Sequence, residues 1–545
     1  MTDDLLSRAR EWLDQDPDPV TRTELQQLLD ADDTAAIEDR FSARLQFGTA
    51  GLRGALGAGP NRMNRVIVAQ AAAGLASYLL AHGDRPSVVI GYDARHNSDV
   101  FARDTAEIME GAGVHAFLLP TCLPTPVLAF AIRHLGCSAG VMVTASHNPP
   151  EDNGYKVYLE DSSQIVPPAD ADISAAIDAV GRVDALPRNT DAYDLLGPEV
   201  AEAYVAAVLT LPTEGPRDIV AVYTPMHGVG RDTLVEVVAR AGFPALHVVR
   251  EQGDPDPDFP TVAFPNPEEP GAMDLSLKLA SEVGADIIVA NDPDADRAAV
   301  GVRDGESYRM LTGDQVGVLL ADFLLRRGVT GTFAASIVSS DLLGRQAAAY
   351  DQPWEQTLTG FKWLGKIPTL AFGYEEALGY SVAPHIARDK DGVSALITVL
   401  ELAAGLKAEG RTLIDRLDDI YREHGLHSTS QLSVRVEDLS IITRGMEVLR
   451  TSPPTVLGGL DVTSVDDLAD GYHGLPPTDG IRLGLAGTDV IESARIICRP
   501  SGTEPKLKCY LEVVVPVGES IEASRNAAEA QIAGIKADLG RALGI

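Results

Sequence analysis

Residues 88–119 read VVIGYDARHNSDVFARDTAEIMEGAGVHAFLL: a β-branched strand candidate, a polar turn, a helical stretch and a second strand candidate. The same order recurs in IVAVYTPMHGVGRDTLVEVVARAGFPALHVV, residues 219–249, and begins again in TFAASIVSSDLLGRQAAAY, residues 332–350. A helix that joins two strands in this way forms a βαβ unit, and such units build mostly parallel sheets. The three widely spaced copies therefore predict three related α/β domains with mixed, mostly parallel sheets.

The C-terminal part of the chain predicts a smaller α+β domain. A strand candidate from about Leu426 is followed by a helix, a Pro/Gly-rich passage, two strand candidates around Arg499 and a final helix. At the other end, residues 1–40 read as helices placed before the first α/β domain, and residues 66–81 predict a buried alanine-rich helix. We expect four domains, at residues 1–210, 211–327, 328–425 and 426–545.

Composition and charge exclude several classes of partner. The 545 residues are 45% hydrophobic and 23% charged, which is ordinary for a globular protein, and the formal net charge is −34. A surface this acidic repels nucleic acid and anionic membranes, so we expect neither as a partner. It would also repel an anionic substrate, so lysines and arginines inside motifs become more informative.

The cysteines and the first residues predict a cytoplasmic protein. The four cysteines include no C-x-x-C pair, which is typical of reduced core residues rather than of a zinc or redox site. The first residues, MTDDLLSRAREWLDQDPDP, are acidic and amphipathic and do not resemble a signal peptide. The sequence does not specify an oligomeric state.

The first chemical motif is VMVTASHNPPEDNGYKVY, residues 141–158. A buried strand runs into a polar turn, which predicts that Ser146 lies at the end of a sheet strand, where ligands of α/β folds bind. A plain strand followed by a polar turn is the alternative. The hydrolase elbow G-x-S-x-G is absent. Lys156 lies ten residues further on and could return to the site as a cation or proton carrier.

The second motif is ADIIVANDPDADRAAVGV, residues 285–302, in which three aspartates alternate in a turn between two apolar strands. Carboxylates packed this way repel one another, and a hard cation removes that cost. A calcium EF-hand does not fit, because Arg297 and Arg303 occupy its glycine and glutamate positions. An exposed acidic turn is the remaining alternative. Magnesium is favoured, because it uses few carboxylates and leaves room for a phosphate oxygen.

Two further motifs carry polar groups suited to a phosphorylated sugar. The stretch CRPSGTEPKLKCYLE, residues 498–512, is a basic, hydroxyl-rich turn that could wrap an anion, although many basic turns are simply solvated. GYEEALGY, residues 373–380, offers two glutamates, which alone are more often a surface feature. A third stretch, GFKWLGK at 360–366, imitates a nucleotide-binding loop. It is followed by Ile367 instead of Ser or Thr, so we do not predict ATP binding.

With these motifs in this order, the chain resembles the α-D-phosphohexomutase superfamily, which includes phosphoglucomutases and phosphomannomutases. The resemblance covers nearly the whole chain, and TASHNP followed by NDPDADR is highly specific. The long N-terminal form is most similar to the branch with phosphopentomutase-type members. The family segments are FGTAGLRG (47–54), GYDARHNS (91–98), TASHNP, NDPDADR, TGFKWLG (359–365), GYEEALGY, RDKDGV (388–393) and RPSGTEPK.

The resemblance implies four domains around a central cleft and a role for each motif residue. Ser146 would be the phosphorylated serine. The metal ligands would be the Ser146 phosphate with Asp292, Asp294 and Asp296, holding Mg²⁺. The residues around the reacting phosphate would be Arg53, His147, Lys156 and Arg297. The substrate-binding residues would be Thr359, Gly360 and Glu375 at the sugar and Lys390, Arg499, Ser501, Gly502, Thr503 and Lys506 at the phosphate that does not react.

The resemblance also implies the reaction. Phospho-Ser146 would pass its phosphate to a sugar hydroxyl, and a bisphosphorylated sugar, which also serves as activator, would return its other phosphate. Sugar 1-phosphates of glucose, mannose or ribose are the expected substrates. The sugar loop has Ala377 where hexose-specific members have serine, so hexose specificity is not assigned. The alternatives are a magnesium-dependent sugar phosphohydrolase and a catalytically inactive sugar-phosphate sensor.

Overall fold

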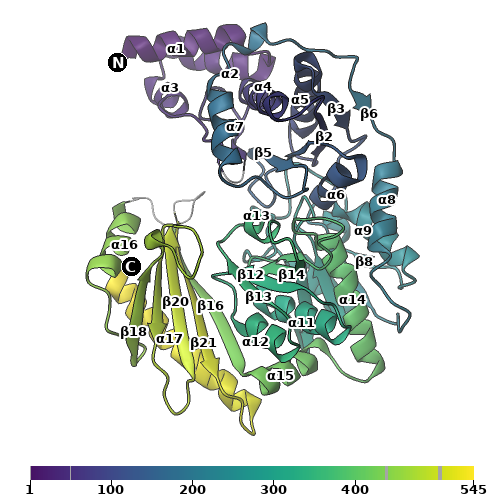
Figure 1. Cartoon of the computed structure of the whole chain (residues 1–545), viewed down its shortest axis with the longest axis vertical. Coiled ribbons are helices and arrows are strands. Elements are labelled where there is room, and N and C mark those ends of the chain that lie inside the picture. Colours follow the sequence, from purple (N-terminus) through teal and green to yellow (C-terminus); the bar gives the residue numbers. More distant parts are fainter. Residues whose placement is uncertain (1, 49–50, 436–439, 501–505, 545) are drawn as a thin grey trace. The chain divides into compact units, whose positions relative to one another are not determined.

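The structure, a computed structural model, describes residues 2–48, 51–435, 440–500 and 506–544 (Figure 1). The chain folds into two compact units. The first comprises Met1–Leu311, Gly365–Pro368 and Ala377–Ala408, and the second comprises Thr312–Leu364, Thr369–Glu376 and Glu409–Ile545. Among the described residues, we find no helix with the length and apolar character needed to cross a bilayer.

The first unit begins with three helices, α1 (Thr2–Gln15), α2 (Pro19–Asp30) and α3 (Thr34–Phe41). Aspartates start two of them: the Asp18 side chain accepts from the Val20 N–H, and Asp33 caps α3 in the same manner. Such capping satisfies a backbone donor that the first turn of a helix leaves unpaired. These helices confirm the prediction for residues 1–40.

The first sheet has six strands in the order β1-β5-β4-β2-β3-β6. Strand β2 is parallel to β3 and β4, and β3 is parallel to β6, whereas β5 is antiparallel to both β4 and β1. The sheet is therefore mixed. Its strands are β1 (Leu52–Ala55), β2 (Ser87–Tyr92), β3 (His115–Leu118), β4 (Ala139–Val143), β5 (Asp152–Leu159) and β6 (Asp194–Leu195).

Five helices accompany this sheet, and α4 is the buried alanine-rich helix that the sequence predicts. Gly74 lets α4 approach α7 closely, because a Cβ atom at this position would lie only 2.7 Å from the Cα atom of Ile177. Any larger residue would force the two helices apart. The helices are α4 (Arg65–His82), α5 (Ser98–Ala112), α6 (Thr125–Leu135), α7 (Ala169–Asp178) and α8 (Glu199–Val208).

The second sheet of the first unit has five strands in the order β11-β10-β9-β7-β8. Strand β7 is parallel to β8 and β9, whereas β10 is antiparallel to β9 and β11. Helix α14 packs against α9. The elements are β7 (Ala221–Thr224), α9 (Gly230–Arg240), β8 (His247–Val248), α10 (Asp274–Val283), β9 (Ile287–Ala290), β10 (Ala299–Asp304), β11 (Ser307–Met310) and α14 (Gly392–Ala408). Strand β15 (Gly379–Ser381) also belongs to the first unit but is not a strand of this sheet.

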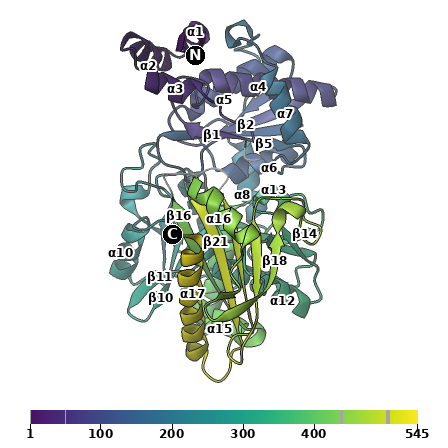
Figure 2. The ribbon, with the colours of Figure 1, turned by 90° about the vertical axis from the view of Figure 1, so that its left-hand side faces the viewer.

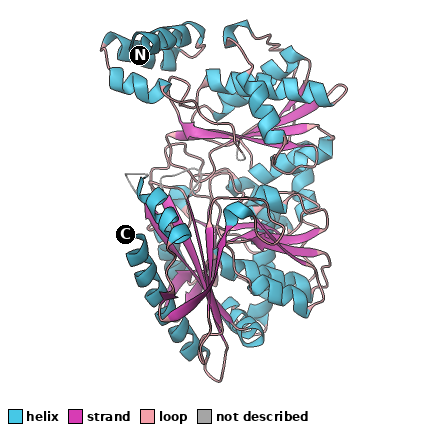
Figure 3. Ribbon diagram, turned by 60° about the vertical axis from the view of Figure 1, so that its left-hand side comes forward, coloured by secondary structure: helices cyan, strands magenta, loops and turns pink. Residues whose placement is uncertain are grey.

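The second unit contains a parallel set of strands, in which β12 lies between β13 and β14 (Figure 1). Figure 3 distinguishes the helices and strands of the chain by colour. Helices α11 and α12 pack against each other, and α12 also contacts β12 and β13. The elements are α11 (Gly313–Arg326), β12 (Thr332–Ser336), α12 (Leu342–Ala349), β13 (Trp354–Thr357), α13 (Phe361–Leu364), β14 (Leu370–Glu375) and α15 (Leu413–His424).

The C-terminal sheet is antiparallel, in the order β16-β21-β20-β19-β18-β17, with α17 packed on β21 and β16 (Figure 2). The predicted Pro/Gly-rich passage contains three strands that sequence reasoning missed, β17 to β19. The elements are β16 (Leu426–Arg435), α16 (Ser440–Thr451), β17 (Val456–Leu457), β18 (Leu460–Asp467), β19 (Ile481–Leu485), β20 (Ser493–Pro500), β21 (Lys506–Val515) and α17 (Ile521–Leu543).

The architecture confirms the predicted fold class of three α/β domains followed by a C-terminal α+β domain. In both sheets of the first unit, chemically important loops follow buried parallel strands. All five residues of β4 and all four of β9 are buried, so the polar loops after Val143 and Ala290 begin at fixed points.

Candidate active site

Ser146 lies in the loop that joins β4 to the antiparallel strand β5. Its backbone has a φ of +51°, in the left-handed region, and its N–H donates to Thr144 Oγ1 at 2.9 Å. The residue is buried, at 3% exposure, and its hydroxyl donates to Asp292 Oδ2 at 2.7 Å. The loop therefore fixes the serine oxygen against a carboxylate that is 146 residues away in sequence.

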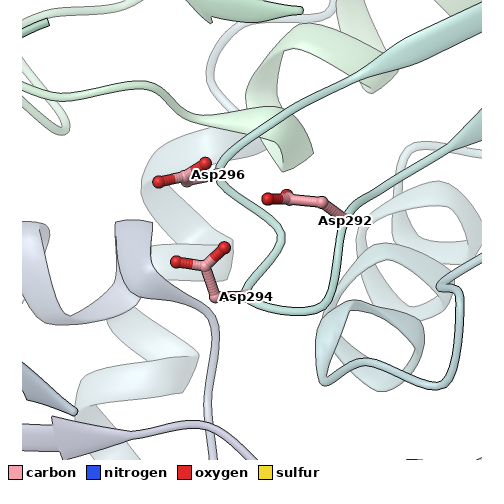
Figure 4. A group of neighbouring side chains, drawn as sticks. All are labelled: Asp292, Asp294 and Asp296. Carbon is pink, nitrogen blue, oxygen red and sulfur yellow. The ribbon is translucent and has the colours of Figure 1, made fainter. Parts of the chain in front are cut away.

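The carboxylates of Asp292, Asp294 and Asp296 all come from the loop that joins β9 to β10 (Figure 4). All three side chains are buried, and one oxygen from each lies within 4.8 Å of the others. Three negative charges confined this way repel one another strongly in a low-dielectric interior. The cluster therefore requires positive charge nearby.

Two lysines supply part of that charge. Lys156, on β5, donates to Asp294 Oδ2 at 2.7 Å and to Asp296 Oδ2 at 2.9 Å, and Lys390 Nζ lies 3.2 Å from Asp296 Oδ2. The Thr125 hydroxyl, at the start of α6, donates to Asp294 Oδ2 at 2.6 Å. One face of the cluster is thus neutralised by protein groups.

The opposite oxygens fit a metal ion. Within the described part of the chain, neither Asp294 Oδ1 nor Asp296 Oδ1 has a hydrogen-bond donor, although both atoms are buried. Buried carboxylate oxygens without a donor are costly, and hard cations such as Mg²⁺ or Ca²⁺ prefer oxygen ligands. The triad therefore has the chemistry of a metal site.

The pKa values show how the charge is distributed. Burial raises the pKa of Asp292 well above its usual range, and the neighbouring Asp294 and Asp296 raise it further. Burial would raise the pKa of Asp296 too, but Lys156 and Lys390 outweigh it and lower that pKa. Burial would lower the pKa of Lys156, but the aspartates outweigh it and raise that pKa. Negative charge thus concentrates on the oxygens nearest the lysines.

Cationic and imidazole groups from strand β1 and from the loops after β4 and β9 surround Ser146 and Asp292. Arg53 Nη1 donates to Asn148 Oδ1 at 3.2 Å, and Arg297 Nε lies 3.8 Å from Asp292 Oδ2. The imidazole Nδ1 of His147 lies 3.3 Å from Ser146 Oγ. Burial, together with the charges of Arg297 and Arg53, lowers the pKa of His147 well below 6.5, so this imidazole is neutral at pH 7.

The second unit carries the predicted sugar-binding residues. The Gly360 N–H donates to Glu375 Oε1 at 2.7 Å, which joins the turn after Thr359 to the end of β14. The adjacent Glu376 accepts from the hydroxyls of Ser336 and Ser339. Glu375 and Glu376 thus have different environments, although they look alike in sequence.

The predicted phosphate loop belongs to the second unit as well. Arg499 lies near the end of β20 and Lys506 begins the neighbouring strand β21. Ser501, Gly502 and Thr503 lie outside the described residues. The two strands are paired up to Pro500 and Leu507.

The first unit brings nine of the predicted residues together. The sequence predicts Lys390 at the phosphate that does not react. In the structure, the Lys390 side chain contacts Asp296 of the metal loop. Sequence reasoning missed Thr125, which has no motif around it. It also missed Arg95, although Arg95 lies inside the quoted segment GYDARHNS. The nine residues are Arg53, Ser146, His147, Lys156, Asp292, Asp294, Asp296, Arg297 and Lys390.

Comparison with protein families identifies the three α/β domains. Three family models match, described as phosphoglucomutase/phosphomannomutase alpha/beta/alpha domains I, II and III, at residues 44–183, 202–305 and 312–424. Together they account for most of the chain.

Individual relatives agree. A "Probable phosphomannomutase" of Haemophilus influenzae is 52% identical over 458 residues, 83% of this chain and 93% of that protein. The "Phosphopentomutase" of Mus musculus is 34% identical over 560 residues, 94% of this chain and 90% of that protein. Both names describe mutases, and neither describes a phosphohydrolase or a sensor.

A solved structure shows the same fold. The open form of the Paramecium phosphoglucomutase pp63/parafusin is 19% identical, with a TM-score of 0.68 over 92% of this chain and 97% of that chain. The three matched domains and the two relatives together show the family. The chain belongs to the α-D-phosphohexomutase superfamily and is a phosphosugar mutase.

Proposed function

We propose that this mutase interconverts sugar 1-phosphates with sugar 5- or 6-phosphates through phospho-Ser146. The observation that carries the proposal is the 2.7 Å hydrogen bond from Ser146 Oγ to Asp292 within a buried acidic triad. A serine placed so close to a metal-type site has its oxygen where a bound cation would neutralise an attached phosphate.

The reaction has two phosphoryl transfers. In the first, the P–Oγ bond of phospho-Ser146 breaks while a P–O bond to a sugar hydroxyl forms, and the hydroxyl proton leaves to a base. Oγ then takes up a proton. In the second transfer, the bisphosphorylated sugar has turned around, and the bond between its other phosphate and the sugar oxygen breaks while a P–Oγ bond to Ser146 forms. The serine proton leaves to a base, and the sugar oxygen takes up a proton. Such transfers depend on positioning and charge neutralisation.

Mg²⁺ is the cation that we assign to Asp292, Asp294 and Asp296, with the Ser146 phosphate as a further ligand. The ion would supply Lewis-acid neutralisation of the phosphoryl oxygens. Arg297, Arg53 and His147 would hold the remaining oxygens of the reacting phosphate. Lys156 would keep two aspartates correctly oriented, because it already bridges them.

Residues of the second unit would hold the sugar and the other phosphate. Glu375 would accept from adjacent sugar hydroxyls, and the turn at Thr359 and Gly360 would orient it. The phosphate that does not react would be bound by Arg499, Ser501, Gly502, Thr503 and Lys506. The sequence predicts Lys390 there as well, but its contact with Asp296 favours a role beside the metal loop.

We propose further that the enzyme accepts both hexose and pentose phosphates. Ala377 offers no hydroxyl to a hexose, and the relatives carry names of both kinds. A sugar bisphosphate would be the activator, since it phosphorylates Ser146. The four-domain division at 1–210, 211–327, 328–425 and 426–545, around a central cleft, and a cytoplasmic location belong to the same proposal.

An activity panel tests the proposal. Glucose, mannose and ribose 1-phosphates, labelled in the phosphate, are each supplied with the matching bisphosphate and Mg²⁺. We expect label to remain on sugar at the new position for at least one hexose and for ribose. Release of the label as inorganic phosphate would contradict the mutase cycle. Excess chelator should stop turnover, Mg²⁺ should restore it, and Ca²⁺, with its longer and looser coordination, should restore it poorly.

A further inference from the structure

Arg95 lies in the loop between β2 and α5 and is buried, at 4% exposure. It contacts no residue of the acidic triad through a hydrogen bond. Its guanidinium instead reaches the loop that carries Ser146, which follows a different strand. A buried guanidinium requires hydrogen-bond acceptors or an ion-pair partner, because burying a charge without them is costly.

The partners are four backbone carbonyls of the Ser146 loop. Arg95 Nη2 donates to Ser146 O at 2.6 Å and to Asn148 O at 2.5 Å. Nη1 donates to Pro149 O at 2.7 Å and to Asp152 O at 3.1 Å. One side chain therefore binds the loop from the nucleophile itself to the first residue of β5.

Two further contacts fix the guanidinium. Asp93 Oδ2 lies 3.4 Å from Arg95 Nε, while Asp93 Oδ1 accepts from the Arg95 N–H and from the Ser98 hydroxyl at the start of α5. On the other side, the guanidinium carbon lies 4.9 Å from the ring centroid of Phe259, which follows β8. Arg95 is thus held between the turn that joins β2 to α5 in the first sheet and the loop that follows β8 in the second sheet.

The second sheet also provides Asp292, to which Ser146 Oγ donates. Contact of one guanidinium with both the serine loop and Phe259 links the two halves of the site. The left-handed φ of Ser146 makes such a link necessary, because a non-glycine residue in this region persists only where the surroundings hold it.

We propose that Arg95 is the positioning residue for the nucleophile: it holds the Ser146 loop so that Oγ stays in line for phosphoryl transfer. The inference rests on the proposed phospho-Ser146 cycle. Lysine cannot replace arginine here, because a single ammonium lacks the planar fork that reaches four carbonyls.

The test compares Arg95→Lys with the matched variant Arg65→Lys. Arg65 also belongs to the first unit and forms a two-bonded ion pair with Asp104, at 2.6 and 2.7 Å, but it does not touch the Ser146 loop. We expect Arg95→Lys to lower kcat about 10²-fold with KM nearly unchanged, because small misplacement of a reacting group costs that much. Arg65→Lys should keep the native kcat, even with a similar fall in Tm.

A second measurement isolates the step. The rate at which glucose 1,6-bisphosphate phosphorylates Ser146, followed by intact mass, should fall with kcat in Arg95→Lys. In Arg95→Ala, millimolar guanidinium ion should restore part of that rate. If the Arg95 variants do not fold, Phe259→Leu is used, and it should lower kcat in the same direction with KM unchanged.

Three outcomes would overturn the inference: a native kcat in Arg95→Lys, an equal loss in Arg65→Lys at the same Tm, or a native kcat in Phe259→Leu where that variant is used. A failure of the proposed phospho-Ser146 cycle would look different from a failure of the Arg95 inference. The cycle fails only if Ser146→Ala keeps mutase activity. A dead Ser146→Ala with a fully active Arg95→Lys would reject only the role of Arg95.

Discussion

Two buried charged clusters, one in each unit, differ in how completely the protein satisfies them. In the first unit, Asp294 Oδ1 and Asp296 Oδ1 have no donor among the described residues. In the second unit, Glu512 accepts from Ser340, His427 and Arg495, and the other two nitrogen groups of Arg495 donate to backbone carbonyls. Both clusters are buried, but only one leaves oxygens for a ligand.

The difference separates a site from a structural connection. Glu512 and Arg495 face each other across β21 and β20, and through Ser339 and Ser340 they tie these strands to the turn after β12. Such a pair, with donors on both carboxylate oxygens, orients the elements that it joins. The acidic triad instead keeps two buried carboxylate oxygens without a hydrogen-bond donor among the described residues, which is tolerated where a ligand compensates for it.

The largest expected effect is on activity, in Asp292→Asn. The substitution removes a ligand oxygen and the acceptor nearest Ser146, so we expect kcat to fall by about 10²–10³-fold. Stability should not fall, because one of three mutually repelling carboxylates is gone; burial first, and then repulsion from Asp294 and Asp296, raise the pKa of Asp292. Kinetics and thermal unfolding check both statements. The control is Asp304→Asn, an exposed residue of β10, and equal kcat loss in both variants would contradict the assignment.

Glu512→Gln should show the opposite pattern. Breaking a buried ion pair leaves Arg495 with an uncompensated charge, so we expect a loss of about 3–5 kcal/mol in the free energy of unfolding of the second unit. The matched control is Glu492→Gln, which breaks an exposed pair with Arg345 and should cost at most about 1 kcal/mol. Denaturant unfolding measures both variants. Equal costs would mean that the buried cluster is not the stronger connection.

Acid should weaken the second cluster in a defined direction. Burial would raise the pKa of Glu512, but Arg495 and His427 outweigh it and hold that pKa well below 4.5. A depressed carboxyl pKa contributes stability that is complete above the unfolded value and is lost as pH falls below it. The titratable and charged groups that face Glu512 are Arg495, His427, Asp341 and Asp314. Stability of native protein should therefore decline below about pH 4.5, more steeply than that of Glu512→Gln; parallel pH curves would refute this.

The smallest expected effect lies at the rim of the reactive cluster. Arg297 donates to the backbone carbonyl of Ala377, so a serine side chain can be added there without removing this contact. A new hydroxyl should favour sugars that bond to it, and Ala377→Ser should raise the hexose-to-pentose ratio of kcat/KM by up to about tenfold. Steady-state kinetics with glucose 1-phosphate and ribose 1-phosphate measures the ratio. An unchanged ratio would remove this loop from specificity.

Local patterns predicted the parts of the molecule that depend on local chemistry. The βαβ repeats predicted the α/β domains, and Ser146 and the aspartates lie after buried strands as expected. Strands β17 to β19 were missed because their residues alternate with polar ones on an exposed face, as in LDVTSVDD of β18. Such alternation is weaker than an apolar run.

Long-range contacts left no mark in the sequence. Arg95 donates to backbone carbonyls. Every residue has a backbone carbonyl, so no residue type in the sequence indicates which ones bind Arg95. Lys390 reaches Asp296 only because residues 377–408 join the first unit, which motif order alone does not reveal. Thr125 bonds to Asp294 although the two residues are 169 positions apart, and no local pattern in the sequence indicates this contact.

The central claim is that Ser146 carries the phosphate, and intact-mass analysis combined with turnover tests it most directly. Native protein incubated with glucose 1,6-bisphosphate and Mg²⁺ should gain the mass of one phosphoryl group and lose it to added sugar phosphate. Ser146→Ala should gain no mass, show no mutase turnover and unfold at the native temperature. Near-native turnover in Ser146→Ala, or mass gain at another residue, would contradict the account.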